Sequence, residues 1–270
     1  MCEFCVQHGE GKKWYLQMKN YSEELFHQKK SDEYVRGFLR QFNEDASKSL
    51  AQMDSLRRKP SFVQRFVRSL IVRKQKKVHY GQIVPIEDVE KVIDLAKVVV
   101  RLPCVCRKVT LGKDVRYCFG VSAPLKGVLD EFPDLTRDFE VLSPEQAKSA
   151  FREFDEKGLV HSVWTFKSPF IGGICNCDCD CLAYQMSFDH NIPMFFKAEY
   201  VAVTDRDLCT GCKECKTFCQ YGAITYSAFN DKCSVDSQRC FGCGVCRSVC
   251  PNEAITLTEK ERAGVLPAKG

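Results

Sequence analysis

The sequence lacks several patterns that would assign a common function. No apolar run approaches the roughly 20 residues that a membrane-spanning helix needs, and the opening stretch "MCEFCVQHGEGKKWY" has no apolar region typical of a secretory signal. There is no G-x-G-x-x-G fingerprint, no P-loop and no C-x3-C-x2-C triplet. These absences argue against dinucleotide binding, phosphoryl transfer and radical chemistry of the S-adenosylmethionine type. We expect an intracellular, cytoplasmic protein.

Cysteine, in contrast, is abundant: the 270 residues include 18 cysteines. Disulfides do not persist in a reducing compartment, so cysteines at this density indicate metal ligation or redox chemistry. Free thiols are common in protein cores, but that interpretation accounts for two or three cysteines and not for all of them. The rest of the composition is ordinary for a globular protein, with 44% hydrophobic and 28% charged residues.

Residues 1–103 show apolar positions at helical spacing, and we expect a mostly helical region that also carries an N-terminal cysteine pair. Helices are predicted over three ranges, 31–58, 61–77 and 85–102. Pro60 separates the first two, and Pro103 ends the third.

Residues 104–203 predict a small, cysteine-rich domain of mixed α/β structure, with short strands around a turn at Gly112. A helix is predicted from the N-cap Ser143, which forms a capping box with Gln146, to the terminating Gly158. The strand "LVHSVWTF" follows, and this order of elements resembles the helix and wing of a winged-helix fold. The fold class expected for the whole chain is α+β.

Residues 204–258 contain a repeat with a period of 31 residues and are followed by a polar tail, 259–270. The stretch "CTGCKECKTFCQYGAIT" at 209–225 aligns with "CFGCGVCRSVCPNEAIT" at 240–256, and both contain C-x2-C-x2-C-x3-C. Three cysteines spaced in this way can surround one [4Fe–4S] cluster, while the fourth reaches the other cluster. The repeat resembles the bacterial two-cluster [4Fe–4S] ferredoxins.

This resemblance implies two ligand sets. One cluster is held by Cys209, Cys212, Cys215 and Cys250, and the other by Cys240, Cys243, Cys246 and Cys219. Three glycines, Gly211, Gly242 and Gly244, are expected to let the backbone approach the clusters and donate N–H hydrogen bonds.

The first repeat departs from the family at one position. The second repeat has Pro251 after Cys250, as the family does, whereas the first has Gln220 after Cys219. Proline carries no ligand, so we expect an altered turn or potential and not a lost cluster. Cys233 has no partner within the repeat and is interpreted as a core thiol beside a cluster. Zinc is disfavoured in this domain because zinc ribbons do not repeat this spacing.

Nine cysteines remain outside this domain: Cys2, Cys5, Cys104, Cys106, Cys118, Cys175, Cys177, Cys179 and Cys181. The whole arrangement resembles uncharacterised multi-cluster ferredoxin-like proteins of anaerobes. These pair a P-C-x-C-R element with a "GLVH…ICNC" element ahead of a two-cluster domain. The resemblance implies further cluster content and no particular reaction.

The stretch "CNCDCDC" at 175–181 places a cysteine at every second position. In an extended strand these sulfurs would spread over about 20 Å of one face, which is too far to chelate one ion. A folded loop would give two Cys-x-Cys pairs to two sites, and nine thiols suit one or two further [4Fe–4S] clusters. Zinc and buried unligated thiols are the alternatives. Asp178 and Asp180 are interpreted as solvated loop acids.

Two further residues near these cysteines in the sequence are candidates for a functional role. His161 precedes the cysteine loop and can ligate a cluster or shuttle a proton, although a structural role on its strand is the plainer interpretation. Arg107 follows Cys106, where a cation would raise a cluster's potential, and a surface arginine is the alternative.

The range Arg57–Lys77 contains nine basic residues and no acidic residue, interleaved with Phe62, Phe66, Leu70 and Ile71. The plainest interpretation is an amphipathic helix whose apolar face packs on neighbouring helices. The alternatives are docking to an acidic partner protein, binding to the inner face of a membrane, and, least favoured, nucleic-acid binding.

Taken together, the patterns favour an electron-transfer protein that relays low-potential electrons to a partner redox enzyme. It would work alone or as a subunit of an oxidoreductase, with protein partners as electron donor and acceptor. One alternative is a reductase with an incompletely ligated, substrate-binding cluster near His161 or Arg107. Another is a redox sensor that uses the winged-helix-like region. No catalytic residue is assigned.

Overall fold

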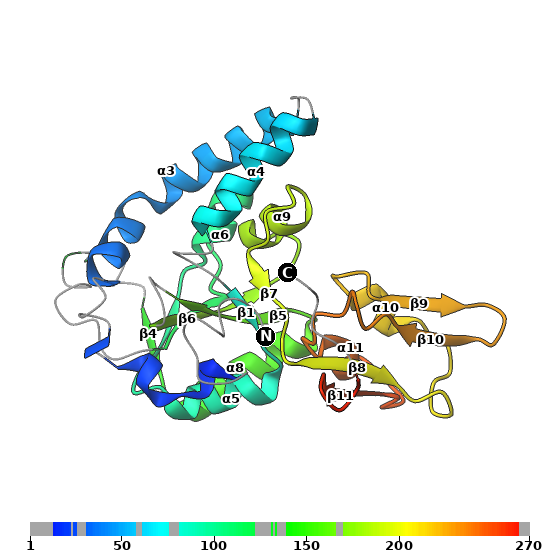
Figure 1. Cartoon of the computed structure of the whole chain (residues 1–270). Coiled ribbons are helices and arrows are strands. Elements are labelled where there is room, and N and C mark those ends of the chain that lie inside the picture. Colours follow the sequence, from blue (N-terminus) through cyan, green and yellow to red (C-terminus); the bar gives the residue numbers. More distant parts are fainter. Residues whose placement is uncertain are drawn as a thin grey trace.

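A computed structural model describes residues 13–22, 24–25, 31–57, 61–75, 81–121, 131, 133, 139–165 and 170–264. It contains helices and sheets, as the expected α+β class requires. A larger part is built on a seven-stranded sheet, and a smaller C-terminal part contains two two-stranded sheets (Figure 1). Within the described ranges, no helix is long and apolar enough to cross a membrane.

The large sheet has the strand order β4-β2-β3-β6-β5-β1-β7. Its strands are β1 (Gly81–Ile83), β2 (Val99–Leu102), β3 (Cys118–Gly120), β4 (Glu140–Leu142), β5 (Val160–Thr165), β6 (Ile171–Cys177) and β7 (Phe195–Phe196). All neighbouring pairs are antiparallel except β1 and β7, which are parallel. The central pair, β5 and β6, is long enough for successive side chains to line both faces of the sheet.

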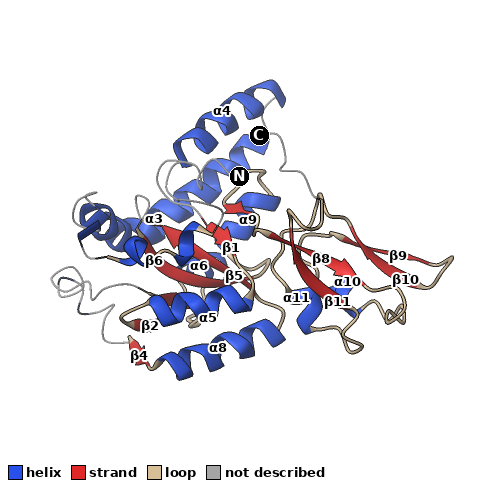
Figure 2. Ribbon diagram, turned by 60° about the horizontal axis from the view of Figure 1, so that its bottom comes forward, coloured by secondary structure: helices blue, strands red, loops and turns tan. Residues whose placement is uncertain are grey.

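Helices cover the two faces of this sheet differently. On one face lie α5 (Ile86–Leu95) and α8 (Pro144–Glu156), which run side by side in Figure 2. Their apolar residues, such as Ile93 and Phe151, pack against Phe119 and Ile174 of the sheet in the main core. The shorter helices α6 (Val105–Leu111) and α9 (Leu182–Phe188) lie beside each other on the opposite side (Figure 1).

The N-terminal region consists of two short turns that pack on the larger part and two longer helices. The short turn η1 (Trp14–Leu16) packs against α5, where Tyr15 Oη donates a hydrogen bond to Asp88 Oδ2 at 2.7 Å, and the turn η2 (Met18–Tyr21) packs against β6. The helices α3 (Ser31–Arg57) and α4 (Ser61–Gln75) project away from the sheet in both Figures 1 and 2.

The predicted helix beginning after Ser143 is confirmed as α8. Ser143 Oγ accepts a hydrogen bond from the Gln146 amide at 3.2 Å, and Gln146 Oε1 accepts one from the Ser143 amide at 2.8 Å. Gly158 follows the helix with a φ of +80°, a conformation that favours glycine. These local signals suffice because a capping box needs no tertiary partner.

Two local predictions are wrong. The segment before Gly112 is the helix α6 and not a strand, and Gly112 is its C-terminal cap with a φ of +66°. The helix predicted to run to residue 102 ends at Leu95, and Val99–Leu102 form the strand β2. A run of β-branched residues there pairs with β3 and β4, so tertiary pairing overrides the helical spacing.

The sheet also changes the expected division of the chain. Strands β1 and β2 lie before the predicted boundary at residue 103, whereas β3 to β7 lie after it, and all belong to one sheet. The strands β5 and β6 follow α8 in the order that suggested a wing. They are central strands of that sheet, flanked by β1 and β3, and do not form a free two-stranded wing.

The smaller part spans two internal repeats. Its elements are β8 (Tyr200–Thr204), α10 (Glu214–Phe218), β9 (Ile224–Ser227), β10 (Lys232–Val235), α11 (Val245–Ser248) and β11 (Ile255–Glu259). Strand β8 pairs with β11 and β9 pairs with β10, both antiparallel. The pairing of β8 with β11 places the start of this unit at Tyr200, slightly before the predicted residue 204. Helix α11 packs against α8 of the larger part.

Candidate iron–sulfur centres

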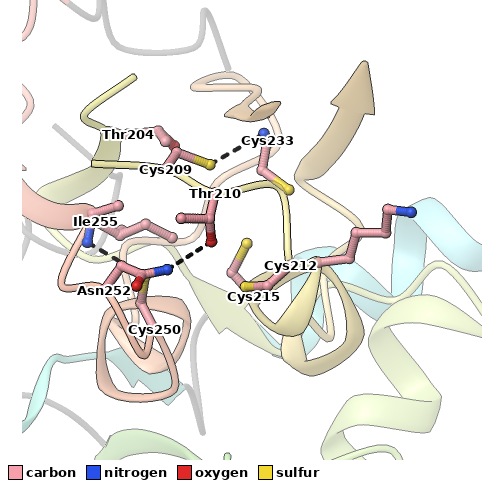
Figure 3. A pocket seen from close by; sticks show the side chains of 11 residues that line it. Thr204, Cys209, Thr210, Cys212, Cys215, Cys233, Cys250, Asn252 and Ile255 are labelled. Carbon is pink, nitrogen blue, oxygen red and sulfur yellow. Dashed lines mark hydrogen bonds between the residues drawn. The ribbon is translucent and has the colours of Figure 1, made fainter. Parts of the chain in front are cut away.

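The first predicted ligand set lines a pocket in the smaller part. Cys209, Cys212, Cys215 and Cys250 all border this pocket, together with Cys233 (Figure 3). The first two come from the loop before α10, Cys215 lies on α10, and Cys250 follows α11, so both repeats contribute. The structure therefore brings together the four cysteines that the ferredoxin resemblance assigns to one cluster.

The cysteines of the second predicted set also lie near one another. The pKa of the Cys246 thiol is raised, first by burial and then by the neighbouring Cys243, Cys240 and Cys219. Cys219 belongs to the first repeat and the other three to the second, which is the exchange of a fourth cysteine that the resemblance implies.

Backbone amides point at the sulfurs in the same way in both repeats. Cys219 Sγ accepts from the Ala223 amide and Cys250 Sγ from the Ala254 amide, each at 3.3 Å. The sulfurs of Cys209 and Cys240 each accept an amide hydrogen bond at 3.5 Å, from Cys233 and Ala202. N–H donors at sulfur stabilise thiolates and anionic clusters, so this donor set fits two [4Fe–4S] clusters.

Two loop glycines occupy equivalent left-handed positions, Gly211 with φ +70° and Gly242 with φ +71°. A side chain at Gly211 would collide with Asp231, and one at Gly242 with the Tyr200 backbone. The Gly242 amide donates to Cys240 Sγ at 3.3 Å, as expected for a glycine in a cluster loop. These glycines therefore let each loop pack closely on a neighbouring segment, and at Gly242 the amide also faces a sulfur.

Burial also makes these thiols poor acids without a cation. It raises the pKa of Cys215 to about 12 and the pKa of Cys243 to about 12. Ligation requires the thiolate, so iron must supply the stabilisation that burial removes, and cluster binding is coupled to the folding of these loops.

A second group of sulfurs lies in the larger part. We call it the six-cysteine site, and it comprises Cys104, Cys106, Cys118, Cys175, Cys177 and Cys181. Two pairs of sulfurs are in contact, Cys118 and Cys175 at 3.6 Å and Cys177 and Cys181 at 3.4 Å. The pKa of Cys106 is raised by a hydrogen bond to Cys181, by burial, and by the charges of Cys104 and Cys175. Cys106 therefore neighbours one member of each sulfur pair, and the two pairs belong to one site.

The fold explains this convergence. Cys118 and Cys175 are direct partners across β3 and β6, and Cys177 lies two residues further along β6 on the same face. Cys104 and Cys181 are the N-cap residues of α6 and α9, which lie beside each other over that face. Strand pairing and two helix starts thus bring distant cysteines together.

The stretch "CNCDCDC" is neither a full strand nor a loop that serves two sites. Cys175 and Cys177 end β6, a turn follows, and Cys181 begins α9, so three of the four cysteines join one site. Cys179 is exposed, and its pKa is raised by partial burial and by Asp180 and Asp178. Cys2 and Cys5 lie outside the described residues.

Arg107 is buried at the edge of the six-cysteine site, with 3% of its side chain exposed, and is not a surface arginine. Its guanidinium donates to Cys104 Sγ at 3.6 Å and pairs with Asp178 Oδ1 at 2.7 Å. Asp178 is thus an ion-pair partner, while Asp180 remains an exposed loop acid. Hydrogen bonding from Cys118, together with the hydrogen bond and charge of Arg107, lowers the pKa of Cys104 to about 7.

The pKa of Cys181 is also lowered, by hydrogen bonds from Cys106 and Cys177 and by the charge of Arg107. The buried cation and the neighbouring thiol donors therefore favour negative charge on Cys104 and Cys181, whereas burial and hydrogen bonding raise the pKa of Cys106, Cys118 and Cys177.

His161 lies on the other face of the sheet. Its Nδ1 is 2.6 Å from Asn176 Oδ1, and its Nε2 is 3.4 Å from Asp155 Oδ1 on α8. Because Asn176 alternates with Cys175 and Cys177 along β6, its side chain points away from theirs. The structure therefore does not bring His161 into the six-cysteine site.

Residues 208–263 match the family model of the 4Fe-4S dicluster domain. A comparison with curated proteins finds no match for the chain. The matched range covers nearly all of the smaller part and supports a C-terminal ferredoxin-like domain with two [4Fe–4S] clusters. It also supports an iron–sulfur electron-transfer role. The six-cysteine site lies outside the matched range.

Sequence reasoning missed the residues that join the two groups of cysteines. Asp155 of α8 accepts a hydrogen bond from Ser248 Oγ of α11, and Gln220 Nε2 donates to the Gly158 carbonyl at 2.9 Å. Tyr221 is buried and stacks on Phe241, with ring centroids 4.0 Å apart. The one feature of the sequence that pointed to this contact was Gln220, which occupies a position where the ferredoxin family has proline.

Proposed function

We propose that this protein transfers electrons between its two ferredoxin clusters and a third [4Fe–4S] cluster at the six-cysteine site. The observation that carries this proposal is one buried apolar cluster that contains cysteines of both groups. Cys177 and Cys181 belong to it, and Cys219 and Cys243 pack against it. The two groups of cysteines therefore meet in one packed apolar core, which is the arrangement that electron transfer between their centres would need.

The exposure of the ferredoxin cysteines suggests an order for the centres. Cys212 is exposed, whereas its repeat equivalent Cys243 is half-buried. Asp155 of the larger part lies close enough to Cys243 to raise its pKa. The first set thus opens towards solvent, where a soluble donor or acceptor protein would dock. The second set lies between it and the six-cysteine site.

The donor chemistry of the six-cysteine site suits an iron–sulfur cluster. Four thiolates hold a [4Fe–4S] cluster, which supplies a one-electron carrier when bound, and six thiols converge here beside the buried cation Arg107. The described residues contain one such site, which favours one additional cluster over two. A fourth cluster would need Cys2 and Cys5.

Zinc is a second candidate occupant, and sulfur spacing favours it. A tetrahedral zinc with Zn–S bonds of about 2.3 Å holds its sulfurs about 3.8 Å apart. The contacts of 3.6 Å and 3.4 Å approach this spacing, and among the described residues no hydrogen bond joins two sulfurs of one ferredoxin ligand set. In the described ranges no three donors are already arranged around one ion, either at this site or in the ferredoxin ligand sets, so this observation does not distinguish zinc from a cluster.

The reductase and sensor alternatives gain less support. The reductase requires a substrate-binding iron beside His161 or Arg107. His161 faces the other side of the sheet, and Arg107 is engaged by Asp178 and Cys104. The sensor relied on a winged-helix layout, and the strands concerned are internal to the large sheet.

Metal and sulfide analysis of anaerobically purified protein tests this proposal. Three clusters predict about 12 irons and about 12 acid-labile sulfides per chain, because each [4Fe–4S] cluster contributes four of each. About eight irons with about one zinc would assign the six-cysteine site to zinc instead. About eight irons without zinc would show that the six-cysteine site binds no metal and would contradict the proposal.

A further inference from the structure

The turn after Cys219 is the contact between the ferredoxin part and the six-cysteine site. Gln220 Nε2 donates to the Gly158 carbonyl at 2.9 Å and to the Cys177 carbonyl at 3.4 Å. The Gln220 carbonyl in turn accepts a hydrogen bond from Tyr184 Oη, so the turn is held on both sides. Cys219 is a predicted ligand of the second ferredoxin cluster, and Cys177 belongs to the six-cysteine site.

Tyr221 continues this contact. Its ring is buried in the apolar cluster that contains Cys177 and Cys181 and against which Cys219 and Cys243 pack, so it lies between the two groups of sulfurs. Its stacking on Phe241 and its contact with Phe188, at 5.4 Å between ring centroids, fill the remaining space. The segment therefore links the two groups through covalent bonds, one hydrogen bond and packed rings.

The second repeat lacks this arrangement. Its equivalent residue is Pro251, which is exposed and has no amide side chain. A proline at position 220 could not donate to either carbonyl. The departure from the family thus occurs in the repeat whose turn faces the six-cysteine site, and it supplies the bond to that site.

We propose that Gln220 is a positioning residue that fixes the electron route from the second ferredoxin cluster, through Cys219, to the six-cysteine site. In each transfer the second ferredoxin cluster loses one electron and the centre at the six-cysteine site gains it, with no proton or bond change. This inference rests on the proposed function, because the six-cysteine site must hold a redox centre.

The variants Gln220→Pro and Gln220→Ala test this route in the full-length protein. We expect full iron content, unchanged ferredoxin EPR signals and electron arrival at the six-cysteine centre slowed about tenfold, because losing a partly buried hydrogen bond loosens the docked contact by roughly that factor. The rate is followed by freeze-quench EPR after rapid reduction of the ferredoxin part. Gln238→Ala, which removes an exposed glutamine from the same part, is the matched control and keeps the wild-type rate.

The outcomes separate this inference from the proposed function. An unchanged rate in both Gln220 variants, with about 12 irons retained, would overturn the route alone. About eight irons in the wild-type protein would overturn the third cluster, and the route with it. Slowing by Gln238→Ala to the same extent would show a general effect on the ferredoxin part and would also overturn the route.

The exposed face of α4 supports a second, independent proposal. The interpretation that its apolar face packs on neighbours does not hold for three residues: Phe62, Phe66 and Leu70 are 70%, 65% and 51% exposed. They recur every four residues, so they form one stripe along the helix. Arg65 and Arg73 are exposed as well.

Charge and shape together indicate what covers this stripe. The range Arg57–Lys77 contains nine basic residues and no acidic one, so an anionic surface complements it. In Figure 2 the helix lies on the side of α3 that faces away from the sheet. A projecting helix with bulky apolar residues and flanking arginines suits insertion into a headgroup layer, whereas a protein partner would need a matching groove.

We propose that α4 binds the surface of a membrane rich in anionic lipids. The wild-type protein is expected to sediment with vesicles of phosphatidylglycerol and phosphatidylcholine and not with phosphatidylcholine alone, and to be released by high salt. The double variant F62S/F66S is expected to bind roughly tenfold or more weakly, because each phenylalanine loses its apolar burial. Phe229→Ser removes a fully exposed phenylalanine from the β9–β10 turn and serves as the matched control.

Circular dichroism and iron content establish that the variants are folded. Failure of the wild-type protein to bind anionic vesicles would overturn the proposal, as would equal binding by F62S/F66S. Salt-sensitive capture of an acidic protein by this helix without any vesicle binding would assign the surface to a protein partner and would likewise overturn it.

Discussion

Replacing Cys243 by serine is expected to remove one [4Fe–4S] cluster, and with it about four irons and four sulfides per chain. Cys243 belongs to the second predicted ligand set and lies where the ferredoxin part meets the larger part, near Asp155. A serine there is a weaker ligand and leaves a half-buried hydroxyl group in place of the thiolate. Iron analysis and EPR of the reduced protein measure the loss.

Because of its position, Cys243→Ser is also expected to lower the stability of the folded protein. Phe241 and Tyr221 pack next to it, so loss of the cluster removes support from the contact between the two parts. Cys212→Ser is the matched variant: it removes a ligand of the first set at an exposed position. Both variants are expected to lose about four irons, but the thermal midpoint of Cys243→Ser falls further.

Cys233→Ser is the control for ligand assignment. Cys233 lines the same pocket as the first ligand set and is buried, yet the repeat gives it no ligand position. The variant is expected to keep all of its iron. Iron loss in Cys233→Ser, or full iron in Cys243→Ser and Cys212→Ser, would show that the predicted ligand sets are wrong.

The sequence predicts the ferredoxin part well because its information is local and repeated. Four cysteines at fixed spacing define each loop, and the repeat shows which residues are equivalent. The same holds for α8, whose start is determined by Ser143 and Gln146 within one turn. Signals of this kind do not depend on how the rest of the chain folds.

The six-cysteine site could not be assembled from the sequence, because it depends on long-range pairing. Cys118 reaches Cys175 only through the register of β3 on β6, and β3 has three residues with no alternating pattern. Cys104 is in place because α6 starts there, in a segment that reads as strand. The number of free cysteines indicated further metal binding, but their grouping required the sheet.

The role of Gln220 shows the same limit at one position. The sequence shows a departure from proline and suggests an altered turn. The partners of its amide, the Gly158 and Cys177 carbonyls, are 62 and 43 residues away in the chain. The sequence can thus show that a residue departs from a family pattern, but the role of that residue requires its partners in the folded structure.

Replacing His161 by alanine is expected to destabilise the larger part by about 2–4 kcal/mol, because buried polar groups that lose their partners keep their desolvation cost. His161 is fully buried between Asn176 and Asp155, and Ser248 continues this chain of polar contacts into the ferredoxin part. The loss is measured as a lower urea midpoint by far-UV circular dichroism under anaerobic conditions.

A double-mutant cycle with Asp155→Ala distinguishes this cause from a simple cavity. Once His161 is gone, Asp155 Oδ1 has lost its contact with the imidazole, while Oδ2 keeps the hydrogen bond from Ser248. Removing both residues should therefore cost less than the sum of the single changes by about 1 kcal/mol or more. Additive losses would show that the two side chains do not interact, and a loss below about 1 kcal/mol for His161→Ala would contradict the buried network. Because the network spans α8, β5, β6 and α11, coupling in this cycle would also show that the ferredoxin part and the sheet are stabilised together. A fixed arrangement of the two cysteine groups requires that shared stability.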